Sequence, residues 1–502
     1  MPDNTTGFLH GVYGEINAVD SPAAQKGRGI KQAFVYIGTA PVHLFDDYSG
    51  KINKPILCNN IAEARALLGY SDDWASFTLC EAMHAHFENK AVGPLVFINV
   101  LNPATHKAGS STTASLTPAN GKVVITSADD VIISTITVAS GQTAKTKGTD
   151  YTVAYDWDKK TITIAEVSAG SLGTDALTIT YYKVSPASVA NADVIGASDT
   201  YGTNTGIYAI RDVYTLTGYM PAFILAPGFS SVPEIHAVLE QCSLGIGKHW
   251  NAWLFADIPL VNSSSVAITL QTAATWKTEN GYTHDNESVF FPMAKGTDGK
   301  NYHLSVLYAA NFQEIYIQNE GVPYMSASNT AIPIQDLYFG ESVTRVIDDE
   351  IINRCLNANG INSAAFVGGK WVLWGMQAGS YSQSAGDSLN VFDTVRMMLY
   401  YLMNDFQYRR NADIDKPLSL NTLKTIVSEE QQRLDALIGA GALLYGKAMA
   451  EAVAVDGSDI YQGNFRIRFE VTTTPLMKSL TGTAVWTNAG FVILAASIND
   501  AA

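Results

Sequence analysis

The stretch AFVYIG, Ala33–Gly38, is an apolar run that ends in a glycine, and it decides the class of the fold. A short continuous run of this kind predicts a strand that is buried on both faces of a sheet. A second apolar run, LVFINV at 95–100, follows two segments with helical spacing, 61–68 and 77–87. Because buried strands alternate with helices, we expect an α/β fold built on an open, partly parallel sheet.

The same pattern resumes after an interruption that begins at about residue 108. The elements predicted beyond the interruption are strands over 222–228, 252–259, 289–291 and 304–308 and a helix over 232–242. We therefore expect residues 31–107 and 187–340 to form one α/β domain.

The interrupting segment, 108–186, is rich in Thr, Ser, Gly and Asp. Short alternating strands are predicted over 123–126, 131–138, 151–155, 161–164 and 177–182, with a hairpin turn at 156–160. Several short strands with regular turn signals predict a small β-sandwich. We interpret it as an insertion into a surface loop, where added length costs little.

Residues 341–488 predict a second, α+β domain. Apolar stripes at helical spacing over 391–406 and 423–438 predict two amphipathic helices, and the polar connector 409–417 separates them. In the strand that follows, four apolar residues alternate with charged ones, which predicts one buried and one exposed face. The apolar residues are Phe465, Ile467, Phe469 and Val471, and the charged ones are Arg466, Arg468 and Glu470.

Both ends of the chain carry apolar segments that belong to no obvious core. An N-terminal arm over 1–30 contains FLHGVYGEI at 8–16, and a C-terminal arm over 489–502 contains FVIL at 491–494, which reads as a strand. Such segments are candidates for strand exchange with a neighbouring subunit, and the alternative is that both termini fold against their own domain. The residues predicted to exchange are Gly11, Val12, Tyr13, Glu15, Ile16, Phe465, Ile467, Phe469, Val471, Phe491, Val492, Ile493 and Leu494.

The composition of the chain disfavours several classes of function. The net charge of −15 disfavours nucleic-acid binding through a basic face. Charged residues make up 16% of the chain, where about a quarter is usual, and this fits either burial against other subunits or a large core. We expect no membrane insertion and no signal peptide. The four cysteines are scattered, which argues against zinc or a disulfide framework and for a reducing cytoplasm.

No motif for catalysis or cofactor binding is complete. The segment 441–448 nearly spells a phosphate-binding loop, but Ala448 stands where a magnesium-binding hydroxyl is needed. Glu81, His84 and Glu88 share a helix face, yet no fourth metal ligand is visible. Asp257 ends a predicted strand, where a turn-capping role is the more common one. We expect no catalytic residue, no cofactor and no metal.

The order of the motifs points to a family. The motifs are GVYxE at 11–15, the strand at 34–38 with TAP after it, 60–69 ending in LG, FENK at 87–90, LAPG at 225–228, ADIP at 256–259, GGKWVLWG at 368–375, and the turn and strand over 441–446 and 463–471. In this order they resemble the sheath proteins of contractile phage tails and of R-type pyocins. The resemblance covers nearly the whole chain outside 108–186. The chain departs from the family at Gly14 and at 376–378, where the family often has Arg-Thr.

The resemblance implies a mechanical role. Sheath subunits form stacked rings around the tail tube, are held in an extended metastable state, and contract to drive the tube through the target envelope. Neighbouring arms complete the sheet of the C-terminal domain, and the implied partners are copies of the chain, the tube protein, and baseplate and terminator proteins. The implied location is the virion tail, assembled in the host cytoplasm, with the insert as an immunoglobulin-like decoration.

Two alternatives and one open assignment remain at this point. The chain could instead be an α/β hydrolase-like enzyme with a carbohydrate-binding β-sandwich, or an adhesin that displays the insert. In the sheath reading, Arg409 and Arg410 are candidates for polar contacts with the tube. Their alternative role is to stabilise the C-terminus of a helix.

Overall fold

The computed structural model describes residues 31–340, 347–383, 389, 391–417, 419–451 and 462–501. Its centre is an eight-stranded sheet with the order β18-β17-β13-β12-β11-β1-β3-β2. The six inner strands run parallel, and each outer strand is antiparallel to its neighbour. In chain order the strands are β1 (Gln32–Gly38), β2 (Pro55–Cys58), β3 (Leu95–Asn99), β11 (Met220–Leu225), β12 (Trp253–Asp257), β13 (Glu287–Phe290), β17 (Ile361–Val367) and β18 (Lys370–Trp374). The α/β architecture predicted from AFVYIG is confirmed.

Helices cover the sheet, and their bounds follow local signals. The helix predicted over 61–68 is α1 (Ile61–Leu68), which begins where the side chain of Asn60 accepts a hydrogen bond from the N–H of Glu63. The helix predicted over 77–87 is α2 (Leu79–Met83), continued by a π-helical segment over His84–Asn89. The remaining helices of this part are α3 (Asn191–Ile195), α4 (Val213–Thr217), α5 (Pro233–Ser243), α6 (Ala273–Glu279) and α8 (Asp349–Cys355).

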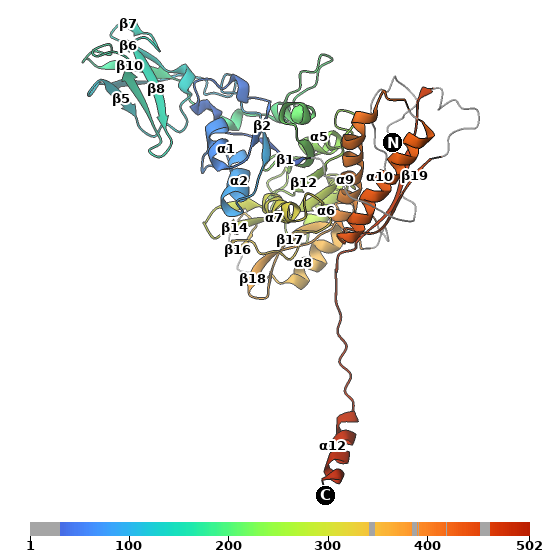
Figure 1. Ribbon diagram of the computed structural model, residues 1–502. Helices are drawn as coiled ribbons and strands as arrows, with labels where there is room; N and C mark the ends of the chain where they lie inside the picture. The colour runs from blue at the N-terminus through green and yellow to red at the C-terminus, as the bar shows by residue number, and fades with distance from the viewer. Residues whose placement is uncertain are drawn as a thin grey trace.

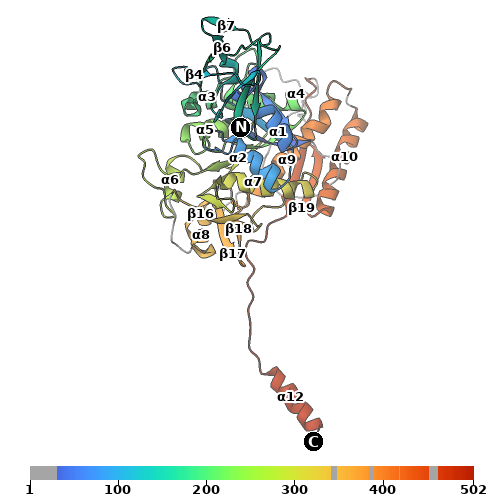
Figure 2. The same cartoon turned by 90° about the vertical axis from the view of Figure 1, so that its left-hand side faces the viewer.

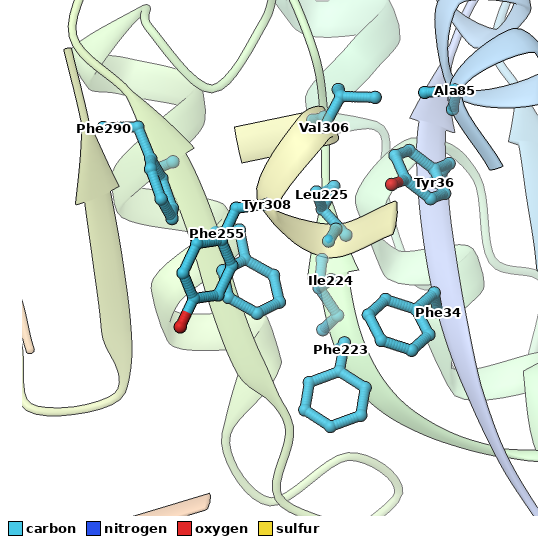
Figure 3. Packing of buried hydrophobic residues seen from close by; sticks show 14 of the residues in the cluster. Phe34, Tyr36, Ala85, Phe223, Ile224, Leu225, Phe255, Phe290, Val306 and Tyr308 are labelled. Atoms are coloured by element: carbon cyan, nitrogen blue, oxygen red, sulfur yellow. The ribbon is translucent and has the colours of Figure 1, made fainter. Parts of the chain in front are cut away.

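The strand predicted over 304–308 is wrong, because these residues open the helix α7 (Leu304–Gln318). This helix crosses one face of the sheet, and its buried side chains point in nearly every direction around its axis. A short apolar run cannot distinguish a buried strand from such a helix. Figure 3 shows the packing that results, with Tyr308 of α7 against Phe255 and Phe290 of the sheet, whose ring centroids lie 5.6 Å and 5.0 Å away.

The segment 108–186 projects from one end of the body as two small antiparallel sheets (Figure 1). One has the order β4-β10-β6-β7 and the other β5-β9-β8, and an apolar cluster separate from the main core lies between them. The strands are β4 (Thr112–Leu116), β5 (Lys122–Ile125), β6 (Thr137–Ser140), β7 (Thr143–Lys145), β8 (Tyr151–Asp156), β9 (Thr161–Glu166) and β10 (Leu177–Tyr181). The segment predicted as a strand over 131–138 contains a 3-10 turn at Ile133–Thr135, and the strand there begins at Thr137.

Specific contacts fix this segment to the body. The Trp157 ring lies 5.8 Å from that of Phe45, and Nε2 of His43 lies 2.7 Å from the carbonyl oxygen of Asp129. Gly69 leaves room for the indole, since a Cβ there would come within 2.8 Å of Trp157. A third small sheet consists of β14 (Met293–Gly296), β15 (Asn301–His303) and β16 (Ile334–Tyr338), and it lies next to α2, where His303 contacts Glu81.

The last third of the chain does not divide from the body at residue 341, as the sequence suggested. Strands β17 and β18 follow that position, yet β17 pairs with β13 and so extends the main sheet. The separate unit is smaller, and an apolar cluster of its own holds it together. It consists of α9 (Asp393–Arg410), α10 (Leu420–Gly439), β19 (Leu443–Ala450) and β20 (Ile467–Thr473).

The C-terminal end leaves the body as an extended strip and finishes in α12 (Ala489–Asp500), far from every other element (Figures 1 and 2). The strand predicted over 491–494 is therefore not present in the single chain. A strand needs a neighbour for its backbone groups, whereas a helix satisfies them within the segment. Among the described residues, no helix has the length and apolarity needed to cross a membrane.

Candidate functional site

The functional feature of the C-terminal unit is a two-stranded sheet with open edges. Strands β19 and β20 pair antiparallel, with Ala448 opposite Phe469 and Gly446 opposite Val471. Among the described residues neither strand has a second partner strand, so each has one edge without a strand neighbour, although the N–H of Ala448 donates to the side chain of Gln431 in α10. Such an edge is a template for a strand from another chain.

One face of this sheet is anchored on the two helices. Leu443 and Ala448 of β19 are buried, and the Phe469 ring of β20 meets Phe406 of α9 edge to face at 5.3 Å. Residues of α9 and α10 complete the cluster, namely Met398, Leu402, Leu434 and Leu437. The predicted alternation holds from Ile467 onward, but Phe465 was wrongly assigned to the buried face, since it precedes the strand and is exposed; β20 pairs within its own chain.

The opposite face is accessible and mixed in character. Arg468 and Glu470 form an ion pair of 2.8 Å along β20, and Leu444 of β19 is largely exposed. A surface pair of this kind contributes well under 1 kcal/mol, so it leaves the face free to change partners. A strand added at either edge would extend an anchored sheet without disturbing its packed face.

Beneath the sheet, a buried ionic network joins the two helices. Glu430 of α10 receives two hydrogen bonds from Arg409, of 2.7 Å and 2.6 Å, and one of 2.6 Å from Arg410. Asp405 of α9 receives bonds from Arg409 at 2.8 Å and from Arg433 at 2.7 Å. Burial alone would raise the pKa of Glu430, but the arginine hydrogen bonds outweigh it and lower that pKa.

This network accounts for Arg409 and Arg410, which sequence reasoning offered as tube contacts. They are the last two residues of α9, and their charged groups are engaged inside the chain, with side chains 18% and 11% exposed. Their position matches the alternative role at a helix C-terminus. Contact with a tube stays a prediction. The sequence reasoning missed Asp405, Glu430 and Arg433, although the spacing of Asp405 and Arg409 was a usable signal.

No described residue outside the C-terminal arm covers its apolar side chains. Phe491, Val492, Ile493 and Leu494, which sequence reasoning assigned to strand exchange, all lie in α12 with exposed fractions of 55–68%. Trp486, just before α12, is 79% exposed. Contiguous exposed apolar side chains mark an interaction surface. The other predicted exchange residues, Gly11, Val12, Tyr13, Glu15 and Ile16, lie outside the described residues.

The groups considered for chemistry have structural partners. The carboxylate of Asp257 accepts hydrogen bonds from the backbone and hydroxyl of Ser305, and that of Glu81 lies 2.8 Å from Nδ1 of His303. Burial raises the pKa of Asp257. Glu88 pairs with Arg65 at 2.8 Å instead of joining Glu81. In the part of the chain that the structure describes, no three metal-binding side chains come together.

The near-match to a phosphate loop is also explained. Gly441 ends α10 with a left-handed φ of 76°, and the chain then runs directly into β19 instead of opening a helix. A phosphate loop needs the helix N-terminus, which is absent from this described segment. The turn serves to reverse the chain between α10 and its sheet.

An anchored sheet without further partner strands and a long exposed apolar arm are features through which one chain can associate with another. Comparisons with known proteins agree. The chain is 24% identical to the tail sheath protein of Burkholderia phage BcepMu over 486 residues, covering 94% of this chain and 96% of the relative. It is 22% identical over 317 residues to the major tail sheath protein of Serratia phage KSP20, covering 61% and 74%. No family model matches the chain.

Two solved structures share the fold. One is the PVC sheath complex of an extracellular contractile injection system in its contracted state, with a TM-score of 0.52, 12% identity, and coverage of 96% and 99% of the two chains. The other comes from the contracted baseplate of the anti-feeding prophage, with a TM-score of 0.54, 12% identity, and coverage of 96% and 100%. The chain is thus similar over nearly its whole length to contractile tail sheath proteins, and the resemblance seen in the sequence is confirmed. Since its relatives are structural proteins, the enzyme reading is set aside.

Proposed function

We propose that this protein is the sheath subunit of a contractile phage tail, polymerising as stacked rings around the tail tube. The observation that carries the proposal is the full-length match to a tail sheath protein, which spans 94% of this chain and 96% of that relative. The extended arm beside an open two-stranded sheet supports it, because that geometry suits strand addition between copies.

In this proposal the arms link neighbouring subunits while the bodies move. The C-terminal arm, and the N-terminal residues 8–16, would add strands to the β19–β20 sheet of neighbouring copies. The backbone hydrogen bonds of the added strands would persist during contraction. The bodies would gain buried surface in the contracted form, which supplies the driving free energy.

The remaining partners and the location belong to the same proposal. The tube protein, a baseplate and a terminator would contact the assembled sheath, which is part of the virion tail and is assembled in the host cytoplasm. Residues 108–186 would form an immunoglobulin-like decoration on the outside, since they project from the end of the body opposite to α12 (Figure 1).

Electron microscopy of the purified protein, without tube protein, tests the proposal. Long hollow tubes of stacked rings are the expected result, formed by a sheath in its low-energy state. Monodisperse particles, both alone and with added tube and baseplate proteins, would refute it. A variant lacking residues 108–186 separates the adhesin alternative, because a sheath should still polymerise without the insert, whereas an adhesin should lose its binding.

A further inference from the structure

The C-terminal segment has a sequence typical of a β-strand but forms a helix. FVIL at 491–494 is an apolar, partly β-branched run, which favours a strand. The structure instead has α12, a helix of 12 residues, all of them exposed. No contact with the body stabilises this helix within the described part of the chain, so its own residues have to sustain it.

Those residues make a poor helix. Gly490 stands in its first turn, and Val492 and Ile493 are β-branched, a combination that lowers helix propensity. Asn488 caps the N-terminus without a side-chain hydrogen bond, and Asp500 places a negative charge at the C-terminus, where the helix dipole opposes it. Isolated helices of about 12 residues are marginal in water. The helix is therefore close to the balance point with other conformations.

The same residues suit a strand in a covered sheet. In extended form Phe491 and Ile493 would lie on one face, and Val492 and Leu494 on the other. A strand that is apolar on both faces is typical of a sheet covered on both sides. On a second copy, the open edges of β19 and β20 are eight and seven residues long, enough to accept this four-residue run with flanking residues.

We propose that α12 is the resting form of a docking strand, which unwinds and adds to the β19–β20 edge of a second copy of this chain. The proposal rests on the proposed sheath function. In the free subunit the helix pairs its backbone N–H and C=O groups internally, so it offers no template to other edges. Docking exchanges these internal hydrogen bonds for bonds between chains and buries the exposed apolar side chains. The free energy needed to unwind α12 then slows docking and delays polymerisation.

Paired variants test this switch. V492L/I493L keeps the apolar volume while favouring helix over strand, and A495V/A496V shifts the preference the other way. V485L, in the exposed linker before α12, is the matched control. The measurements are far-UV circular dichroism of the free subunit, the lag before light scattering rises, and solid-state NMR shifts of residues 491–494 in assembled tubes.

The free wild-type subunit should show the helix, and its assembled tubes should show strand shifts at 491–494. V492L/I493L should lengthen the lag several-fold, A495V/A496V should shorten it several-fold, and V485L should leave it unchanged. Helical shifts in the tubes, or equal lags for all variants, would overturn the switch.

Deletion of 489–502 distinguishes strand exchange by the arm from the helix-to-strand switch. If the deletion abolishes tubes while the lags stay equal, strand exchange by the arm holds and the switch is wrong. If tubes form without the arm, the role proposed for the arm is itself wrong, and the switch is wrong with it.

Discussion

The hydroxyl of Tyr36 in the central strand β1 lies 2.5 Å from Nε2 of His86, and Nδ1 of the same ring lies 2.6 Å from the amide oxygen of Gln313 in α7. All three side chains are buried. In the neutral ring, Nδ1 donates to Gln313 and Nε2 accepts from Tyr36, so each polar atom of the ring has a partner. Burial lowers the pKa of His86 to about 4.

The first prediction concerns acid stability. Since the unfolded chain binds a proton on this histidine at about pH 6.5 and the folded chain at about 4, stability is complete above pH 6.5 and falls as the pH drops toward 4. The loss from this group is about 3 kcal/mol. H86Q cannot titrate, so urea unfolding should show it less stable than wild type at pH 7.5 but with a smaller further loss by pH 5. An identical pH slope in both proteins would contradict the assignment.

A second buried group, Asp393, makes stability fall as the pH rises, which is the opposite of the effect of His86. Asp393, at the start of α9, accepts a hydrogen bond of 2.7 Å from Tyr308, and burial raises its pKa to about 7. The folded state then holds the proton more tightly than the unfolded chain, so stability falls as the pH rises from about 4 to 7 and is level above that. D393N should be stabilised relative to wild type at pH 8, by about 1–3 kcal/mol, and not at pH 4.5. Denaturant titrations at both pH values check this, and an equal effect at both would disprove it.

Loss of a buried carboxylate from the ionic network under the β19–β20 sheet is expected to lower the stability of the protein strongly. E430Q removes the charge shared by Arg409 and Arg410 and should cost about 3–5 kcal/mol, because Arg409 then keeps only Asp405 and Arg410 keeps only carboxylates that are more exposed. E429Q is the matched control, since Glu429 pairs with Arg410 from a half-exposed position and should cost under about 1 kcal/mol. Thermal unfolding of the two variants compares them directly. Equal losses would mean that the buried position of Glu430 has no special weight.

The contact between the insert and the body makes a fourth prediction. Trp157 packs on Phe45 and sits over Gly69, so W157A should loosen the insert without unfolding it. Limited proteolysis in the connecting segments near 107 and 184 should quicken several-fold, and W157F should restore much of the protection. Unchanged cleavage would show that the hydrogen bond from His43 is sufficient to hold the insert.

The local sequence pattern predicted an element correctly wherever its burial and its hydrophobic period indicate the same structure. The run at 33–38 and the helix at 61–68 were correctly predicted because their burial pattern fits one structure. The run at 304–308 was not, since a helix buried on all sides carries no period. The run at 491–494 was not, because a strand prediction assumes a partner strand that the single chain lacks.

The candidate site was predictable in outline only. The alternation in β20 predicted a sheet with one buried face, but most of its partner β19 was considered only as a near-match to a phosphate-binding loop. The ion pairs of Arg409 and Arg410 depend on Glu430, which is brought near by the packing of two helices. Sequence spacing contains the first kind of information and not the second.

The linker between Thr473 and Ala489, which contacts the body through Thr474 and Lys478, also limits the distance between subunits. Fully extended, a linker of about 15 residues spans at most about 50 Å. If the arm of one copy binds to another copy, this linker sets the maximum separation of the two subunits. Two subunits joined by it can move relative to each other until the linker is fully extended. Beyond that separation, a displaced subunit has to move its neighbour with it.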